Sequence, residues 1–191
     1  MMSRSKWKEF SQLLDVRYFN SVSTTRTSLG FIKTFLGITT SEKVIEKDGL
    51  NSIFNYHPIA DGLSTSGQPQ PGHFPMIRAA GFTTVINLAP HGAENALPNE
   101  AELVAANGMD YIHIPVAFDN PTEDNFAQFC RALAVYPQQP VFIHCAANMR
   151  VSAFVFRYRT QVLGEDTGTA KPDLDKLWKP FGVWAEFIGL A

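Results

Sequence analysis

The sequence predicts an α/β fold, in which helices flank a mostly parallel central sheet on both faces. From residue 51 onward, short β-branched or apolar segments alternate with amphipathic segments of helical length. Parallel strands need crossover connections of this kind between them. The best strand candidates are continuously apolar, as strands covered on both faces are. With 191 residues, 45% of them apolar, the chain can bury one core of ordinary size.

Five segments have the composition of strands. Residues 52–56 and 63–66 are predicted as short strands on either side of a turn at Asp61-Gly62. The other three consist of β-branched and apolar residues typical of buried strands: 83–88, 111–116 and 141–144. The last of these leads directly into the loop that carries the candidate site.

Helices are predicted between the strands. Residues 71–80 have proline near the start and Gly81 after the end, and residues 98–107 are followed by Gly108. A helix after residue 145 has one apolar stripe and ends at Gly164. The C-terminal stretch is predicted to form one or two helices, broken near Pro180, whose aromatic residues belong to the core.

The clearest helix begins after Thr122, a plausible N-cap. Glu123 and Asp124 follow in the first turn, where carboxylates suit the helix dipole. Apolar side chains then fall at i, i+3, i+4 and i+7 and form one buried face: Phe126, Phe129, Cys130 and Leu133. We therefore interpret Cys130 as a core thiol rather than a reactive one.

Composition excludes several classes of protein. A net charge of −2 gives no basic surface for nucleic acid. Two cysteines form no disulfide framework, and a reducing cytoplasm is the expected location. The histidines have no zinc-site spacing, so neither a metal nor a cofactor is predicted; they are His57, His73, His91, His113 and His144.

The first fifty residues differ from the rest. Residues 16–41 contain no acid but include Arg17, Arg26 and Lys33 among many serines and threonines. Targeting peptides and membrane-surface arms share this composition. The better interpretation is a peripheral or flexible extension at residues 1–50, followed by a single α/β domain at residues 51–191.

The loop from His144 to Arg150 connects a predicted buried strand to a helix. Such a loop turns several backbone N–H groups, here those of residues 146–149, toward one concavity at a helix N-terminus. This arrangement suits an oxyanion such as phosphate or sulfate, and it stabilises a thiolate at Cys145. Arg150 can donate two parallel N–H bonds to such an anion. His144 is predicted to lie under the loop and bond its backbone.

Each of these residues alone has a structural alternative. Cys145 could be a small core residue, Arg150 a charge on the helix surface, and His144 a satisfied core imidazole. Their combination with strand, loop and helix favours an anion site that uses a cysteine nucleophile. The residues that supply the loop backbone to the anion are then Ala146, Ala147, Asn148 and Met149.

Several segments of the sequence resemble a known protein family. The resemblance lies in residues 64–69 (STSGQP), 80–88 (AGFTTVINL), 111–116 (YIHIPV) and the pair His144-Cys145. These residues are similar to the bacterial phosphatase-like domain of beta-lactamase-hydrolase-like proteins, within the dual-specificity and tyrosine phosphatase superfamily. The resemblance covers roughly residues 52–163.

The resemblance implies a cysteine-phosphatase-like fold and a two-step hydrolysis of phosphomonoesters. Cys145 attacks phosphorus, the loop amides and Arg150 hold the oxygens, and water then hydrolyses the phosphocysteine. A loop aspartate protonates the leaving oxygen in such enzymes. Asp119 occupies that place and Asp124 is the reserve candidate; the alternative for Asp119 is an ordinary turn residue before Pro121.

The loop departs from the usual phosphatase pattern. Four residues rather than five separate Cys145 from Arg150, and Asn148 stands where glycine is expected. Asparagine is the best non-glycine residue for a positive φ angle, so the bend can survive. A loop of this length resembles that of rhodanese-type sulfurtransferases, which carry a persulfide. Phosphatase, sulfurtransferase and a phospho-ligand-binding pseudo-phosphatase therefore stay open.

Ser152 lies seven positions after Cys145. Phosphatases keep a hydroxyl at this offset that assists departure of the thiolate. The alternative is a serine that bonds its own helix backbone.

Overall fold

The computed structural model describes residues 20–35, 48–93, 95–136 and 139–190. Five strands form one sheet in the order β1-β2-β5-β3-β4. They are β1 (His57–Ala60), β2 (Leu63–Ser66), β3 (Thr84–Asn87), β4 (Asp110–His113) and β5 (Val141–His144). Only the β1–β2 pair is antiparallel, and β5 lies between two parallel neighbours. The predicted, mostly parallel sheet is confirmed.

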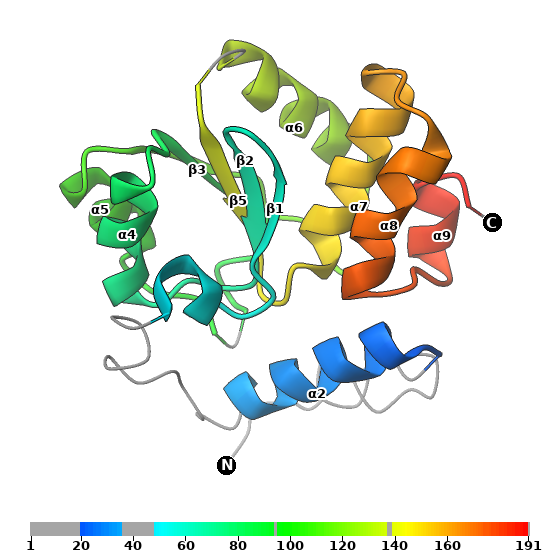
Figure 1. The fold of residues 1–191 in the computed structure, drawn as a ribbon, viewed down its shortest axis with the longest axis horizontal. Helices are drawn as coiled ribbons and strands as arrows, with labels where there is room; N and C mark the ends of the chain where they lie inside the picture. Colours follow the sequence, from blue (N-terminus) through cyan, green and yellow to red (C-terminus); the bar gives the residue numbers. More distant parts are fainter. Residues whose placement is uncertain (1–19, 36–47, 94, 137–138, 191) are drawn as a thin grey trace.

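Helices cover both faces of this sheet (Figure 1). On one side lie two short helices, α4 (Phe74–Ala79) and α5 (Glu100–Ala106), beside the short helical segments η2 (Gly49–Ser52) and η3 (Pro71–His73). Four helices lie on the other side: α6 (Glu123–Val135), α7 (Met149–Arg157), α8 (Thr167–Leu177) and α9 (Val183–Phe187). The last turn of α7 continues as a π-helix, η4 (Tyr158–Val162).

Two hydrophobic clusters fill the space between sheet and helices. The larger lies toward α6 to α9 and includes Phe154, Trp178 and Trp184, each at most 1% exposed. The predicted placement of the C-terminal aromatic residues in the core is therefore right. Cys130 is partly buried and packs against this cluster, and burial raises the pKa of its thiol.

The prediction of a strand at residues 52–56 is wrong. Ile53 N–H donates to the Leu50 carbonyl and Tyr56 N–H to that of Ile53, so the segment is a pair of turns. Asn55 has a φ of 51°, which no strand residue adopts. The apolar pair Ile53-Phe54 has strand-like composition because it packs on the body, and the strand itself begins at His57.

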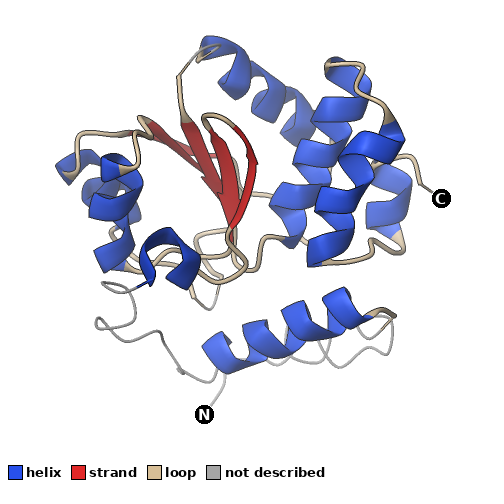
Figure 2. Cartoon of the chain, in the orientation of Figure 1, coloured by secondary structure: helices blue, strands red, loops and turns tan. Residues whose placement is uncertain are grey.

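Part of the predicted N-terminal extension is a helix, α2 (Val22–Phe35). It lies at the end of the domain where β5 runs into α7 (Figures 1 and 2). Over residues 22–33 its fully buried side chains are the hydroxyls Thr24, Thr27 and Ser28, Phe31 packs against the larger cluster, and Val22 is 88% exposed. Residues 1–19 and 36–47 of that extension lie outside the described residues. Within the described part, no helix is long and apolar enough to cross a membrane.

Candidate active site

The predicted site loop follows β5, the central strand of the sheet. Cys145 N–H continues the pairing with β2, donating to the Ser66 carbonyl at 3.3 Å. The side chain of Cys145 is fully buried, and residues 145–149 are between 0% and 7% exposed. Because β5 ends here and α7 begins at Met149, the cysteine lies at the carboxyl end of a parallel strand, where α/β sheets bind their ligands.

The carbonyl groups of the loop are held from outside by donors. The Ala146 oxygen accepts from Gln68 N–H at 3.3 Å and from the Asn95 side-chain amide at 3.0 Å. The Ala147 oxygen accepts from the Asn55 amide at 3.0 Å. In a trans peptide the N–H of the following residue points opposite to the carbonyl. The amides that follow these carbonyls are therefore directed away from the outer donors, as an anion-binding loop requires.

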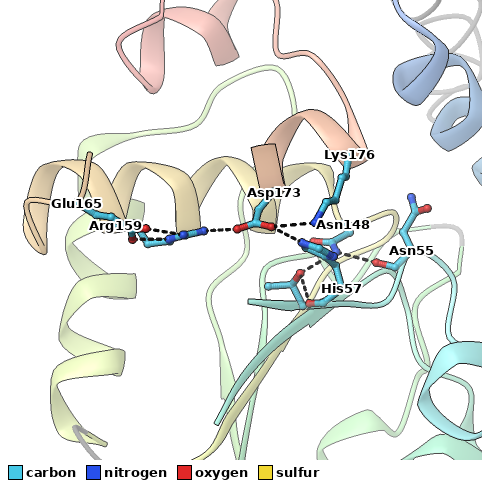
Figure 3. A network of polar contacts seen from close by, with 8 residues as sticks. Asn55, His57, Asn148, Arg159, Glu165, Asp173 and Lys176 are labelled. Atoms are coloured by element: carbon cyan, nitrogen blue, oxygen red, sulfur yellow. Dashed lines mark hydrogen bonds and ion pairs between the residues drawn. The ribbon is translucent and has the colours of Figure 1, made fainter. Parts of the chain in front are cut away.

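Asn148 makes the bend that the sequence required. Its φ is 66°, in the left-handed region, as predicted for a residue that replaces glycine. Both hydrogens of its side-chain amide are used, one by the Asn55 carbonyl at 2.8 Å and one by Thr65 Oγ1 at 2.9 Å (Figure 3). Asn55 and Asn148 are the two non-glycine residues with positive φ in the described ranges. They bond each other's segments reciprocally.

Close approach of the chain beside the loop depends on Gly67. A Cβ added there would lie 2.9 Å from the Phe54 carbonyl and 3.1 Å from that of Ala146. Gly67 N–H donates to the Phe54 carbonyl at 2.8 Å. Any side chain at this position would push the segment before β1 away from the loop. Gly67 belongs to the motif STSGQP, and this contact is a physical reason for its glycine.

A polar network ties the loop to α8 (Figure 3). Thr65 Oγ1, which accepts from Asn148, donates to the His57 carbonyl at 3.2 Å. The His57 ring contacts Asp173 at 2.8 Å, and Asp173 accepts from Arg159 at 2.7 Å. Burial would raise the pKa of Asp173, but its bonds from Arg159 and His57 lower it. The loop is thus supported by the edge strand β1 and by α8.

Arg150 is the second residue of α7 and has an unused donor. Its guanidinium carbon lies 5.1 Å from the centre of the Phe118 ring, which orients the side chain. Its Nε is buried and has no hydrogen-bond partner among the described residues. An unpaired buried donor on a cation is costly, and a bound oxyanion would satisfy it.

His144 is the last residue of β5 and is buried, but the predicted hydrogen bond to the loop backbone is wrong, because neither ring nitrogen has a hydrogen-bond partner among the described residues. Its contact is a carboxylate that the sequence did not suggest. Its Nε2 is 3.0 Å from Glu100 Oε1, in an ion pair that lacks hydrogen-bond alignment. Glu100 also accepts from Gln68 at 2.7 Å, Asn87 at 2.6 Å and Tyr111 at 3.1 Å. Burial opposes ionisation, but His144 and the hydrogen bonds from Gln68 and Tyr111 lower the Glu100 pKa from 4.5 to about 2. In the sequence, Glu100 looks like an ordinary first-turn acid.

The two candidate acids differ in their surroundings. Asp119 is exposed in the turn between Ala117 and Asn120, next to Phe118, whose ring contacts Arg150. The turn therefore lies beside Arg150, which is itself partly exposed. Asp124, in the first turn of α6, accepts from Gln128 at 2.7 Å at an exposed position. The Asp119 turn thus contacts Arg150 through Phe118, whereas the Asp124 carboxylate is bonded within α6.

The Ser152 hydroxyl makes two hydrogen bonds within the protein. Its hydroxyl donates to the Met149 carbonyl at 3.1 Å and accepts from the Trp178 indole at 3.1 Å. This is the backbone-bonded arrangement of the structural alternative. It anchors the first turn of α7 to the aromatic core.

Solved structures resemble this fold. A candidate phosphatase (DUF442) from Shewanella putrefaciens CN-32 is 30% identical, with a TM-score of 0.67 over 74% of this chain and 93% of its own. TpbA of P. aeruginosa in complex with pTyr is 18% identical, with a TM-score of 0.53 over 64% of this chain and 72% of its own. At that identity, the likeness to TpbA concerns the fold alone.

The sequence relatives that match are beta-lactamase hydrolase-like proteins. A beta-lactamase hydrolase-like protein of Agrobacterium fabrum (strain C58) is 33% identical over 129 residues, 65% of this chain. The match spans only 28% of that relative's length. The family model of the beta-lactamase hydrolase-like protein, phosphatase-like domain, matches residues 55–157, more than half of the chain. The chain therefore belongs to the beta-lactamase hydrolase-like phosphatase-like domain family.

Proposed function

We propose that this protein hydrolyses phosphomonoesters through a phosphocysteine formed on Cys145. The observation that carries the proposal is the unpaired, buried Nε of Arg150 beside a loop whose carbonyls are bonded outward. Both features leave N–H donors for the equatorial oxygens of a tetrahedral anion. Membership of a phosphatase-like family supports the same chemistry.

The reaction has two steps. The Cys145 thiolate attacks phosphorus, the bond from phosphorus to the ester oxygen breaks, and Asp119 gives its proton to the leaving alcohol. Water then attacks the phosphocysteine and gives a proton to Asp119, the sulfur–phosphorus bond breaks, and inorganic phosphate leaves. Arg150 and the loop amides hold the charge that grows on the phosphoryl oxygens in both steps.

Aryl phosphates are the first substrate class to test. TpbA, of similar fold, was crystallised with pTyr, which supports trying phosphotyrosine peptides beside p-nitrophenyl phosphate. We expect turnover that vanadate inhibits and that Cys145→Ser abolishes. Cys130→Ser is the matched control, because that thiol belongs to α6 and not to the loop, so its replacement should leave turnover unchanged. No turnover of any substrate between about pH 5 and 8 would contradict the proposal.

The four-residue spacing between Cys145 and Arg150 favours one second candidate, sulfur transfer. In that reaction Cys145 takes the outer sulfur of thiosulfate and sulfite leaves, which produces a persulfide. Mass spectrometry after incubation with thiosulfate would show a gain of one sulfur, absent in Cys145→Ser. Oxyanion binding without turnover or sulfur gain would instead identify a phospho-ligand-binding pseudo-phosphatase.

A further inference from the structure

Helix α2 is attached to the domain by packing of Phe31 against the larger core cluster and by hydrogen bonds, two of them involving buried hydroxyl groups. Thr27 Oγ1 donates to the Leu177 carbonyl at 2.6 Å, and Thr24 Oγ1 accepts from Lys179 N–H at 2.8 Å. Both threonines are completely buried. The last carbonyls of a helix have no partner within it, so Thr27 satisfies one at the end of α8. Together with the packing of Phe31, these directional bonds fix the position of α2.

One of these hydroxyls also leads to the anion loop. The Asn55 side-chain amide has two hydrogens. One is donated to Thr27 Oγ1 at 3.1 Å and the other to the Ala147 carbonyl at 3.0 Å. The amide therefore joins α2 to the loop directly. Thr24, one turn earlier on the same buried face, has no such bond to Asn55 among the described residues.

We propose that α2 contributes to the anion site. Thr27 of α2 and Asn55 act as positioning residues. Thr27 orients the Asn55 amide, and that amide holds the Ala147 carbonyl outward. An unheld carbonyl could turn toward the bound anion, where its negative end would repel the phosphoryl oxygens. The inference rests on the proposed anion-binding function and adds to it. The family match begins at residue 55, so Thr27 lies outside the region that defines the family.

Coupling of this kind is reciprocal. If docking of α2 favours the anion-binding shape of the loop, a bound anion must favour docking of α2 by the same factor. Hydrogen exchange of the α2 amides should then slow when an inorganic oxyanion is added. A helix that merely shields the surface would not respond to a ligand in the loop.

The test uses the full chain, with tungstate as an inert phosphate-like probe. Calorimetry measures tungstate affinity for wild type, Thr27→Val, Asn55→Asp and the control Thr24→Val, which removes an equally buried hydroxyl bond of α2. Loss of one hydrogen bond corresponds to about a five-fold change, so Thr27→Val should weaken binding by about that factor. Asn55→Asp, which cannot donate to Ala147, should weaken it at least as much. Thr24→Val should change it by less than about two-fold.

Hydrogen exchange of the α2 amides is the second measurement. Tungstate should slow exchange across residues 22–35 in wild type and Thr24→Val, but not in Thr27→Val or Asn55→Asp. Equal affinity in all four proteins, or equal losses in Thr24→Val and Thr27→Val, would overturn the positioning role while leaving the anion site standing. Absence of tungstate binding to the wild type would overturn the anion site itself and this inference with it.

Discussion

Asn148 offers a sharp test of how the shortened loop keeps its shape. Asn148→Gly retains a residue that adopts a φ of 66° freely but removes two hydrogen bonds, to the Asn55 carbonyl and to Thr65 Oγ1. The position is completely buried in the wild type. At about 1 kcal/mol each, with some further cost for unpaired acceptors, the free energy of unfolding should fall by about 2–3 kcal/mol.

Asn148→Ala separates the backbone effect from the side-chain effect. It removes the same two bonds and also places a Cβ in the left-handed region, which costs about 1 kcal/mol more than glycine. Urea unfolding at pH 7 measures both variants against wild type. A glycine variant as stable as wild type would mean that the amide bonds contribute nothing. Equal stability of the two variants would mean that the left-handed bend is not maintained.

Three further predictions concern the site. The folded pKa of Glu100, about 2, lies below its ordinary 4.5, so the carboxylate stabilises the fold by about 3 kcal/mol above pH 4.5. That contribution is lost as pH falls from 4.5 to 2. The acid unfolding curve of Glu100→Gln should not show this loss of stability. A curve identical to that of the wild type would contradict the ion pair between Glu100 and His144. Arg150→Lys keeps the charge but loses paired donation, so tungstate affinity should drop by about 10- to 100-fold in calorimetry, and an unchanged affinity would exclude Arg150 from the site. Asp119→Asn should lower kcat for alkyl phosphates by about 100-fold and for p-nitrophenyl phosphate by less; equal effects would remove Asp119 as the acid.

Local patterns predicted much of this fold. The strand at 141–144 has the predicted bounds, and Thr122 caps α6 by accepting from Asn125 N–H at 3.2 Å. The left-handed bend at Asn148 also follows from local reasoning, because few residues tolerate positive φ. In each case the determining interaction lies within a few residues of the position itself. Sequence periodicity and capping rules detect interactions of that range.

What the sequence did not indicate depends on contacts between distant residues. Glu100 reads as a solvated first-turn acid, yet it is 4% exposed and contacts His144, which follows it by 44 positions. Asn55 falls in a segment predicted as a strand, and its role depends on partners at Thr27 and Ala147. No spacing within one segment encodes such partners. The candidate residues of the loop itself were identified because Cys145 and Arg150 are close in the chain.

The contact between Asn148 and Asn55 has a practical consequence for handling the protein. It joins residues 93 positions apart, so the loop takes its shape only after the chain has folded. An anion held there would bind the native state and not the unfolded chain. Phosphate at 100 times its dissociation constant would then add about 2.7 kcal/mol of stability. For a chain of this size that raises the melting temperature by about 5–10 °C, so stability measured in phosphate buffer should exceed that measured in Tris.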